Sequence, residues 1–244
     1  MRAGRRPVME LFKAGVPVNR VWMARDSHDG SIGEIRRLAR EAGVPVLEVD
    51  RSKLDAMAEG INHQGVVASV LPRAYVEVDD LLSLAAERGE APWLVALDGL
   101  EDPQNLGAIL RTVEAVGAHG VIITKRRSVQ VAGGVVKASA GAVDLVPVAR
   151  VSNLVQTLEY LKQKGCWVVG LAPEGQSLYH QSDLTGGLVL VIGGEGKGLS
   201  QLTLRTCDYL AALPMRGQIG SLNASVAAGV ILYEALRQRM GKNS

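Results

Sequence analysis

The stretch LPMRGQIGSLNASVAAGVILYE, residues 213–234, joins an apolar run to a glycine-containing loop and then to a helix. The apolar run at 210–213 predicts a strand, and Ser221, Asn223 and Ser225 are the first polar residues of the predicted helix. Backbone N–H groups at a helix N-terminus have no partner within the helix and suit an anion or a polar ligand. Ser and Asn also cap helices that bind nothing. Because one such loop is compatible with either role, the other loops must decide.

Composition indicates an ordinary globular protein. The chain has 244 residues, of which 47% are hydrophobic and 21% charged, and this length allows one large domain or two smaller ones. Cys166 and Cys207 are too few for a disulfide framework and lack metal-ligand spacing. The start of the chain lacks a signal-peptide core, and no later run has membrane-spanning length. We therefore expect a cytoplasmic protein without a membrane segment and without a metal site.

Charge is distributed unevenly along the chain. Lys and Arg against Asp and Glu number 12 to 9 in residues 1–73, 1 to 5 in 74–90, and 14 to 11 in 91–244. Both outer parts are mildly basic, which permits nucleic-acid binding without requiring it.

Residues 1–73 alternate helical and strand patterns and predict a small α/β domain. The expected helices are 7–14, 33–42 and one that begins near Ser52, and the expected strands are 18–24, 44–49 and 66–71. Ser52 and Asp55 resemble a capping box. Residues 74–91 are acidic, have prolines on both sides and include a helical stretch at 78–88. We interpret this segment as a linker.

Residues 92–244 repeat a strand, loop and helix pattern. The expected strands are 93–98, 121–124, 145–148, 167–172, 188–192 and 209–213, and the expected helices are 105–116, 152–164, 199–207 and 225–239. Near-continuous apolar strands are typical of a parallel sheet buried on both faces. The pattern predicts a doubly wound α/β domain, in which ligands bind beyond the carboxyl ends of the strands.

The glycine-rich loop GGEGKGLS, residues 193–200, is not a common nucleotide motif. A P-loop aligned on the Gly-Lys pair would require Gly at position 191, which is Val191, and Ser or Thr at position 198, which is Gly198. A dinucleotide fingerprint would require Gly at position 199, which is Leu199. The loop can still lay backbone amides against a flat ligand, and Glu195 is its only acid.

Three segments together resemble the signature motifs of the SpoU family, ribose 2′-O RNA methyltransferases of the SPOUT class. They are NLGAILR at 105–111, GGEGKGLS at 193–200 and the opening stretch at 213–234. NHQGVVASV at 62–70 further resembles the substrate-recruiting domain of the bacterial 23S rRNA guanosine-2′-O-methyltransferases, a domain similar to ribosomal protein L30e. The resemblance spans both predicted domains.

The resemblance implies features that no pattern of strands predicts. Members of the family tie the C-terminal part of the catalytic domain into a deep trefoil knot and work as homodimers, although knots are nearly absent from proteins in general. The cofactor is S-adenosylmethionine. By analogy its pocket uses Gly193, Gly194 and Gly198 from the second motif and Leu213, Met215 and Leu222 from the third.

The resemblance also implies a catalytic set. Arg111 corresponds to the catalytic arginine, which acts either as the base for the ribose hydroxyl or as a clamp for an RNA phosphate. Asn105, Glu195, Ser221 and Asn223 would form a polar shell around it. Each residue alone also has an ordinary explanation: Asn105 could cap its helix, Glu195 could neutralise Lys197, and Arg111 could be a solvated helix residue. Matching spacings in three loops favour the catalytic interpretation.

The predicted activity is S-adenosylmethionine-dependent 2′-O-methylation of a guanosine in the peptidyl-transferase region of 23S rRNA. Five basic residues in loops are candidates for phosphate contacts: Lys125, Arg126, Arg127, Lys137 and Arg216. Residues 130–134, QVAGG, are unusual for the family and could alter contact with the target nucleotide. Two alternatives remain open: a tRNA ribose methyltransferase of the same class, and a non-catalytic ribosome-assembly factor.

Overall fold

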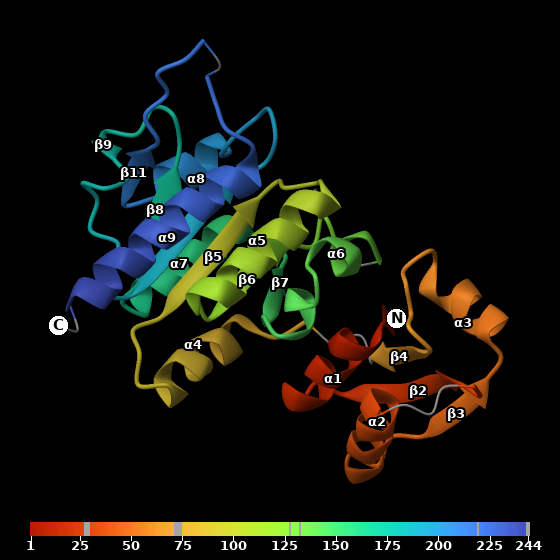
Figure 1. The fold of residues 1–244 in the computed structure, drawn as a ribbon. Helices are drawn as coiled ribbons and strands as arrows, with labels where there is room; N and C mark the ends of the chain where they lie inside the picture. Colours follow the sequence, from red (N-terminus) through yellow and green to blue (C-terminus); the bar gives the residue numbers. More distant parts are fainter. Residues whose placement is uncertain (27–29, 71–74, 127, 132, 219, 243–244) are drawn as a thin grey trace. The chain divides into compact units, whose positions relative to one another are not determined.

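A computed structural model describes residues 1–26, 30–70, 75–126, 128–131, 133–218 and 220–242 (Figure 1). The chain divides into two compact units, Met1–Ala74 and Tyr75–Ser244, here called the front unit and the catalytic unit. Arg127 and the chain on both sides of the predicted boundary at residue 73 lie outside the described residues.

The front unit is a four-stranded sheet with helices on both faces. Its elements are β1 Arg2–Ala3, α1 Arg5–Lys13, β2 Val18–Ala24, α2 Gly30–Glu41, β3 Val46–Val49, α3 Arg51–Ala58 and β4 Val66–Val70. The strand order is β1-β4-β2-β3; β2 and β3 are parallel, and β4 is antiparallel to β1 and β2. Buried residues of α1 and α2 pack on one face of the sheet, and those of α3 pack on the other. Each predicted helix and strand of this unit has a counterpart.

The predicted capping box of α3 is wrong. The helix begins at Arg51, one residue before Ser52, because Asp50 occupies the N-cap position in extended conformation. The carboxylate of Asp55 instead lies 3.0 Å from Nε2 of the buried His63. Asp55 therefore ties α3 to the loop before β4 and does not start the helix.

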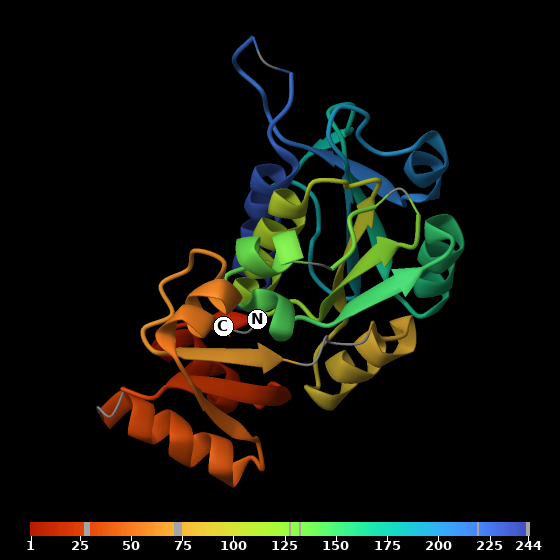
Figure 2. The same cartoon turned by 90° about the vertical axis from the view of Figure 1, so that its right-hand side faces the viewer.

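The catalytic unit is built on a seven-stranded sheet whose recorded strand pairs are all parallel (Figure 2). Its elements are α4 Val78–Glu87, β5 Trp93–Asp98, α5 Pro103–Val116, β6 Gly120–Thr124, α6 Gly133–Ala138, the 3-10 helix η1 Ala142–Asp144, β7 Val148–Val151, α7 Leu154–Gln163, β8 Trp167–Leu171, β9 Ser177–Leu178, β10 Leu188–Gly193, α8 Gln201–Thr206, β11 Tyr209–Ala212 and α9 Ala224–Lys242. The strand order is β7-β6-β5-β10-β8-β11-β9. This confirms the predicted doubly wound α/β fold.

Helices cover both faces of this sheet. Buried side chains of α5 and α9 form one core with β5, β6 and β10, and those of α4, α7 and α8 contribute to the opposite face. Figure 2 shows α5 and α9 on one side of the sheet and α7 on the other. Valine, leucine, isoleucine and alanine make up nearly all of both cores, as expected from strands buried on both faces.

The segment predicted to be a linker belongs to the catalytic unit from Tyr75 onward. Leu81 and Ala85 of α4 are fully buried, and Val76 forms a parallel bridge with Ala149 of β7. A methyl group on Gly120 would lie 2.5 Å from the Leu81 side chain, so α4 packs directly on the start of β6. The acidic residues of the segment cap α4, where the Glu77 amide donates to the Asp80 carboxylate at 2.8 Å.

The strand predicted at 145–148 is displaced. β7 begins at Val148, and Leu145 follows η1 with its side chain exposed. The strand pairs with β6 from Val121↔Val148 onward. Four short elements, β1, α6, η1 and β9, were not predicted. None of the described helices combines the length and the apolar character needed to cross a membrane.

Candidate active site

Three loops at the carboxyl edge of the catalytic sheet enclose a cleft of about 650 Å³. The loops follow β8, β10 and β11, and the described residues of the last one extend beyond the sheet (Figure 1). β5 and β10 are neighbours, and the chain leaves β5 toward β6 on one side of the sheet and leaves β10 toward β11 on the other. Ligands of doubly wound sheets bind at such a switch point.

All six residues predicted to hold the cofactor line this cleft: Gly193, Gly194, Gly198, Leu213, Met215 and Leu222. Met215 is 36% exposed and Leu222 is 42% exposed, although both are large apolar side chains. Apolar surface exposed inside a concavity is favourably covered by a flat, mostly apolar ligand. The cleft therefore suits a flat, mostly apolar ligand group.

The loop after β10 folds tightly on itself and on the neighbouring strand. A methyl group on Gly193 would lie 2.2 Å from the carbonyl carbon of Gly198, and one on Gly194 would lie 2.0 Å from the carbonyl oxygen of Gly99. No side chain fits at either position. The glycines thus explain how the loop can form one wall of the cleft.

Asp98, the last residue of β5, holds both ends of this loop. Its backbone carbonyl accepts a hydrogen bond from the Gly194 amide at 2.9 Å, and its carboxylate accepts one from the Ser200 amide at 2.8 Å. Asp98 was not among the predicted site residues. An acidic residue at the carboxyl end of an apolar strand was the signal that could have identified it.

A chain of side-chain amides connects the three predicted motifs. The Asn105 amide nitrogen donates to the Glu195 carboxylate, and the Asn223 amide nitrogen donates to the Asn105 oxygen at 2.9 Å. Asn105 is only 4% exposed, so its donor and acceptor need these partners. Residues separated by 90 and 118 positions are thereby brought together.

The ordinary explanations of these residues can now be judged. Asp102 caps α5 by accepting from the Gln104 amide at 2.9 Å, so Asn105 does not cap its helix. No ion pair joins Glu195 to Lys197 among the described residues. Asn223 does cap α9, since its oxygen accepts from the Ser225 amide at 2.9 Å, and it still reaches Asn105 with its nitrogen.

Ser221 and Arg111 stand apart from this chain of amides. Ser221 lines the cleft and is exposed. Arg111 is exposed on α5 and does not line the cleft. It lies on the same helix face as Gly107, four residues earlier, where a methyl group would meet the Ala138 side chain of α6 at 2.4 Å. Arg111 is thus placed beside α6, outside the cofactor cleft.

Neither cysteine is a candidate nucleophile. Burial raises the pKa of Cys207 to about 11 and also raises the pKa of Cys166, so both thiols stay protonated near neutral pH. In the part of the chain that the structure describes, no three His, Cys, Asp or Glu side chains gather in a way that could hold a metal ion.

Comparison with known proteins identifies both units. The SpoU rRNA Methylase family matches residues 92–233, and the family described as RNA 2′-O ribose methyltransferase substrate binding matches residues 3–76. Together these matches include the first two motifs, NHQGVVASV and the third motif up to residue 233.

Similar proteins span nearly the whole chain. A putative TrmH family tRNA/rRNA methyltransferase, YacO, of Bacillus subtilis is 47% identical over 236 residues, which are 97% of this chain and 94% of that protein. A 23S rRNA (guanosine-2′-O-)-methyltransferase, RlmB, of Pseudomonas aeruginosa is 48% identical over 223 residues, 91% of this chain and 89% of that protein.

Solved structures agree with the fold. The SpoU methyltransferase AviRb from Streptomyces viridochromogenes, in complex with AdoMet, is 27% identical with a TM-score of 0.80 and covers 98% of this chain and 90% of its own. The AdoMet-bound rRNA methyltransferase from Sinorhizobium meliloti has a TM-score of 0.79 at 28% identity, with 97% and 86% covered. The chain therefore belongs to the SpoU rRNA methylase family and is an S-adenosylmethionine-dependent RNA methyltransferase.

Proposed function

We propose that this protein methylates the 2′-hydroxyl of a guanosine in 23S rRNA, in the peptidyl-transferase region, in the cytoplasm. The observation that carries the proposal is the 48% identity, across both units, with a relative named as a 23S rRNA guanosine-2′-O-methyltransferase. The cleft supports it, because three separate loops assemble a cofactor pocket with a polar chain of side chains at one side.

S-adenosylmethionine, when bound, supplies an electrophilic methyl carbon on a positively charged sulfur. The glycines Gly193, Gly194 and Gly198 would lie against it with their backbone, and Leu213, Met215 and Leu222 would cover its apolar parts. The ribose 2′-oxygen would gain this methyl group and release its proton to solvent, and S-adenosylhomocysteine would be the second product. A ribose hydroxyl is a weak nucleophile, so the protein must hold it in line with the methyl group.

The polar chain supplies that orientation. Glu195 is the acceptor, Asn105 fixes its carboxylate, and Asn223 fixes Asn105. A carboxylate at the wall of the cleft can accept a hydrogen bond from a ribose hydroxyl, and Ser221 offers a second polar group at the same wall. We assign these four residues to positioning the ribose.

Arg111 fits the role of a phosphate clamp better than that of a base. An exposed guanidinium is well hydrated and keeps its proton in proteins. A planar, charged fork of donors instead matches a phosphate in a bidentate pair. With Arg111 outside the cleft, its partner is the RNA backbone next to the reacting ribose.

The variant Arg111→Lys separates the two roles. A clamp predicts partial activity, a raised KM for RNA and a rate that is nearly independent of pH between 7 and 9. A base predicts a rate that rises about tenfold per pH unit over the same range, because a lysine loses its proton only near pH 10. Arg111→Ala is the reference for complete loss of the side chain.

The target is tested by methyl transfer from labelled S-adenosylmethionine to separate preparations of 23S rRNA and total tRNA, followed by mapping of the modified ribose. We expect one modified guanosine in 23S rRNA. Label in tRNA would favour the rival activity, which the tRNA/rRNA description of the Bacillus subtilis relative keeps open. Calorimetric binding of S-adenosylmethionine without label in either RNA would indicate a non-catalytic assembly role.

We also propose that the protein is a homodimer that pairs through α9. This helix is apolar on two sides: Ala228, Ile231 and Leu232 face the core, whereas Val226, Val230, Tyr233 and Met240 are exposed. The exposed residues are four, three and seven positions apart and share one face of the helix. Exposed apolar side chains that share one helix face are typical of a protein interface, and a second copy offers the same face.

The family resemblance further supports a trefoil knot in the catalytic unit and an L30e-like front unit. β11 lies next to β8, and the chain returns from it as α9, which packs with α5 against β5 and β10. A knot requires a return of this kind. Pulling the chain by its two ends should leave a knotted chain shorter than its full contour length. Extension to the full length would exclude the knot.

A further inference from the structure

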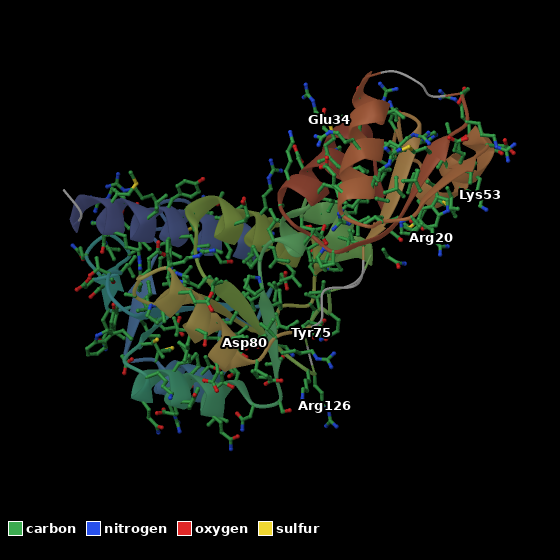
Figure 3. All side chains as sticks on the ribbon, turned by 90° about the horizontal axis from the view of Figure 1, so that it is seen from below. Arg20, Glu34, Lys53, Tyr75, Asp80 and Arg126 are labelled. Atoms are coloured by element: carbon green, nitrogen blue, oxygen red, sulfur yellow. The ribbon has the colours of Figure 1, made fainter. Side chains whose placement is uncertain are left out.

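A dense polar network surrounds Tyr75, the first residue of the catalytic unit (labelled in Figure 3). Its hydroxyl donates to the Gln130 side-chain oxygen at 3.3 Å and accepts from the Val131 amide at 2.9 Å. The Arg150 guanidinium lies 4.5 Å from the centre of the tyrosine ring and donates to the same Gln130 oxygen at 3.2 Å. The network thus joins the entry of the catalytic unit, β7 and the chain after β6.

Gln130 fixes the shape of the described residues between β6 and α6, which are 125–126 and 128–131 and are here called the β6–α6 loop. Its side-chain nitrogen donates to the Thr124 carbonyl at 3.3 Å and to the Ser128 carbonyl at 3.0 Å. The Thr124 hydroxyl in turn donates to the Arg126 carbonyl at 2.7 Å. The side-chain amide of Gln130 therefore links the two ends of the described part of the loop through backbone carbonyls.

The β6–α6 loop also touches the segment that leads to the predicted catalytic residues. The Val129 amide donates to the Leu100 carbonyl at 2.8 Å, two residues before the Asp102 cap of α5. Both segments follow carboxyl ends of neighbouring parallel strands, β5 and β6. The loop lies at the edge of the sheet where the cleft opens.

The outer side of this network is positively charged. Lys125, Arg126 and Arg150 are exposed, and none forms an ion pair with a carboxylate of the described residues. The Lys125 amide donates to the Val151 carbonyl at 2.8 Å, so Lys125 and Arg126 follow β6 beside the strand that carries Arg150. An RNA backbone is the polyanion that the activity brings to this edge, and phosphate contacts position RNA without reading its sequence.

We propose that the β6–α6 loop is a phosphate-binding loop for the substrate RNA, and that Tyr75 and Gln130 are positioning residues that hold it. The proposal rests on RNA being the substrate. It assigns Lys125 and Arg126 to phosphates of the strand that carries the target ribose. A loop that is already ordered loses little conformational entropy when the RNA binds.

The first test is the salt dependence of RNA binding in the absence of cofactor, measured by filter binding with a 23S rRNA fragment. Each lost phosphate contact lowers the slope of log K against log salt by about 0.7 to 0.9. Lys125→Ala/Arg126→Ala should therefore lower the slope by about 1.4 to 1.8 and weaken binding at low salt.

The matched control is Arg88→Ala/Lys164→Ala, which removes the same charge from residues before β5 and β8, at the opposite edge of the sheet. The control should keep the wild-type slope. Equal slopes for the two double variants would overturn the phosphate-binding role of the loop.

The second test is Tyr75→Phe, which removes only the hydroxyl that joins Gln130 and Val131. We expect the KM for RNA to rise about 3- to 10-fold, as one or two hydrogen bonds are lost, while kcat and S-adenosylmethionine affinity stay within twofold. Tyr160→Phe is the control, because the Tyr160 hydroxyl donates to Asp79 of α4, away from the loop. An unchanged KM in Tyr75→Phe, or equal effects in both variants, would contradict the positioning role.

The outcomes separate this proposal from the activity. If Lys125→Ala/Arg126→Ala lowers the salt slope of RNA binding but the wild-type protein transfers no methyl group, the proposed function is wrong and the loop assignment remains. Methyl transfer with a slope that does not depend on Lys125 and Arg126 would do the reverse.

Discussion

Asn223 uses the two ends of its side-chain amide for different purposes. The oxygen caps α9 by accepting from the Ser225 and Val226 amides, and the nitrogen donates to Asn105. Capping and site formation were alternatives when only the sequence was considered. In the structure one residue does both, because an asparagine carries an acceptor and a donor about 2 Å apart.

Asn223→Asp separates these purposes. The carboxylate retains the cap and places a negative charge at the N-terminus of a helix, so thermal stability should fall less than in Asn223→Ala. The donor to Asn105 is lost, and the loss of a buried hydrogen bond costs about 1 to 3 kcal/mol, or about 5- to 150-fold in kcat if the bond orients the reacting ribose. Melting temperature and single-turnover rate are the measurements. Asn223→Ala, which removes both groups, should lower both.

His119 predicts an acid-sensitive transition in stability. Burial lowers its pKa, since the ring is almost fully enclosed and its Nδ1 accepts from the Trp93 amide at 3.0 Å. A histidine held neutral contributes stability above its unfolded pKa, near 6.5, and this contribution is lost as pH falls through the lower folded value. We expect the free energy of unfolding to fall between pH 7 and 5 by less in His119→Gln than in the wild type. Parallel pH curves for the two proteins would contradict this.

At this scale the sequence predicted much of the cleft. Nine of the predicted residues line it, and the assignment of their roles stays a prediction. The motifs supplied these positions because each lies in a loop after a strand. Asp98 was missed because it acts through the backbone of a distant loop, and local spacing does not reveal such a partner.

Among the elements, α5 and α6 illustrate a close packing that depends on a missing side chain. A methyl group on Gly107 would lie 2.4 Å from the Ala138 side chain and 2.8 Å from its backbone carbonyl carbon. Gly107→Ala should therefore push α6 away from α5 and destabilise the catalytic unit by about 1 to 3 kcal/mol.

The control for this variant is Gly33→Ala on α2, where a methyl group meets nothing within 4 Å. That change should stabilise the front unit by about 0.5 to 1 kcal/mol, because alanine favours a helix over glycine. Chemical denaturation followed by tryptophan fluorescence measures both. A Gly107→Ala variant with an unchanged free energy of unfolding would show that α6 is free to shift.

The elements that sequence reasoning misplaced share a physical cause. The strand expected at 145–148 is an apolar run, but strand pairing with β6 selects Val148–Val151 instead. α6 contains two glycines in six residues and has no intrinsic helix preference, so only its packing against α5 forms it. Long apolar strands such as β5 were predicted with their observed bounds because burial on both faces leaves a continuous signal.

For the molecule as a whole, the exposed apolar face of α9 predicts a dimer. Val230→Asp/Tyr233→Asp places two charges on that face and should halve the mass seen by analytical ultracentrifugation, because buried unpaired charges oppose association. Leu47→Asp, which adds a charge at an exposed leucine of β3, should keep the wild-type mass. A wild-type protein that is already monomeric at micromolar concentration would refute the pairing.

The knot and the dimer lie beyond any reading of local patterns. Both depend on which segments pass one another in space, and periodicity reports only which face of a helix or strand is buried. The resemblance to a known family suggested both features, and they remain predictions for this protein.

The burial of Leu81 over Gly120 has a practical consequence for the choice of fragment boundaries. The two family matches stop at residue 76 and resume at residue 92, and a recombinant fragment that began at the second match would lack α4. Its β6 would then offer bare apolar surface to water and to other copies, which invites aggregation during expression. Splicing between residues 74 and 75 keeps that helix with its sheet, and hybrids with related enzymes should be joined there.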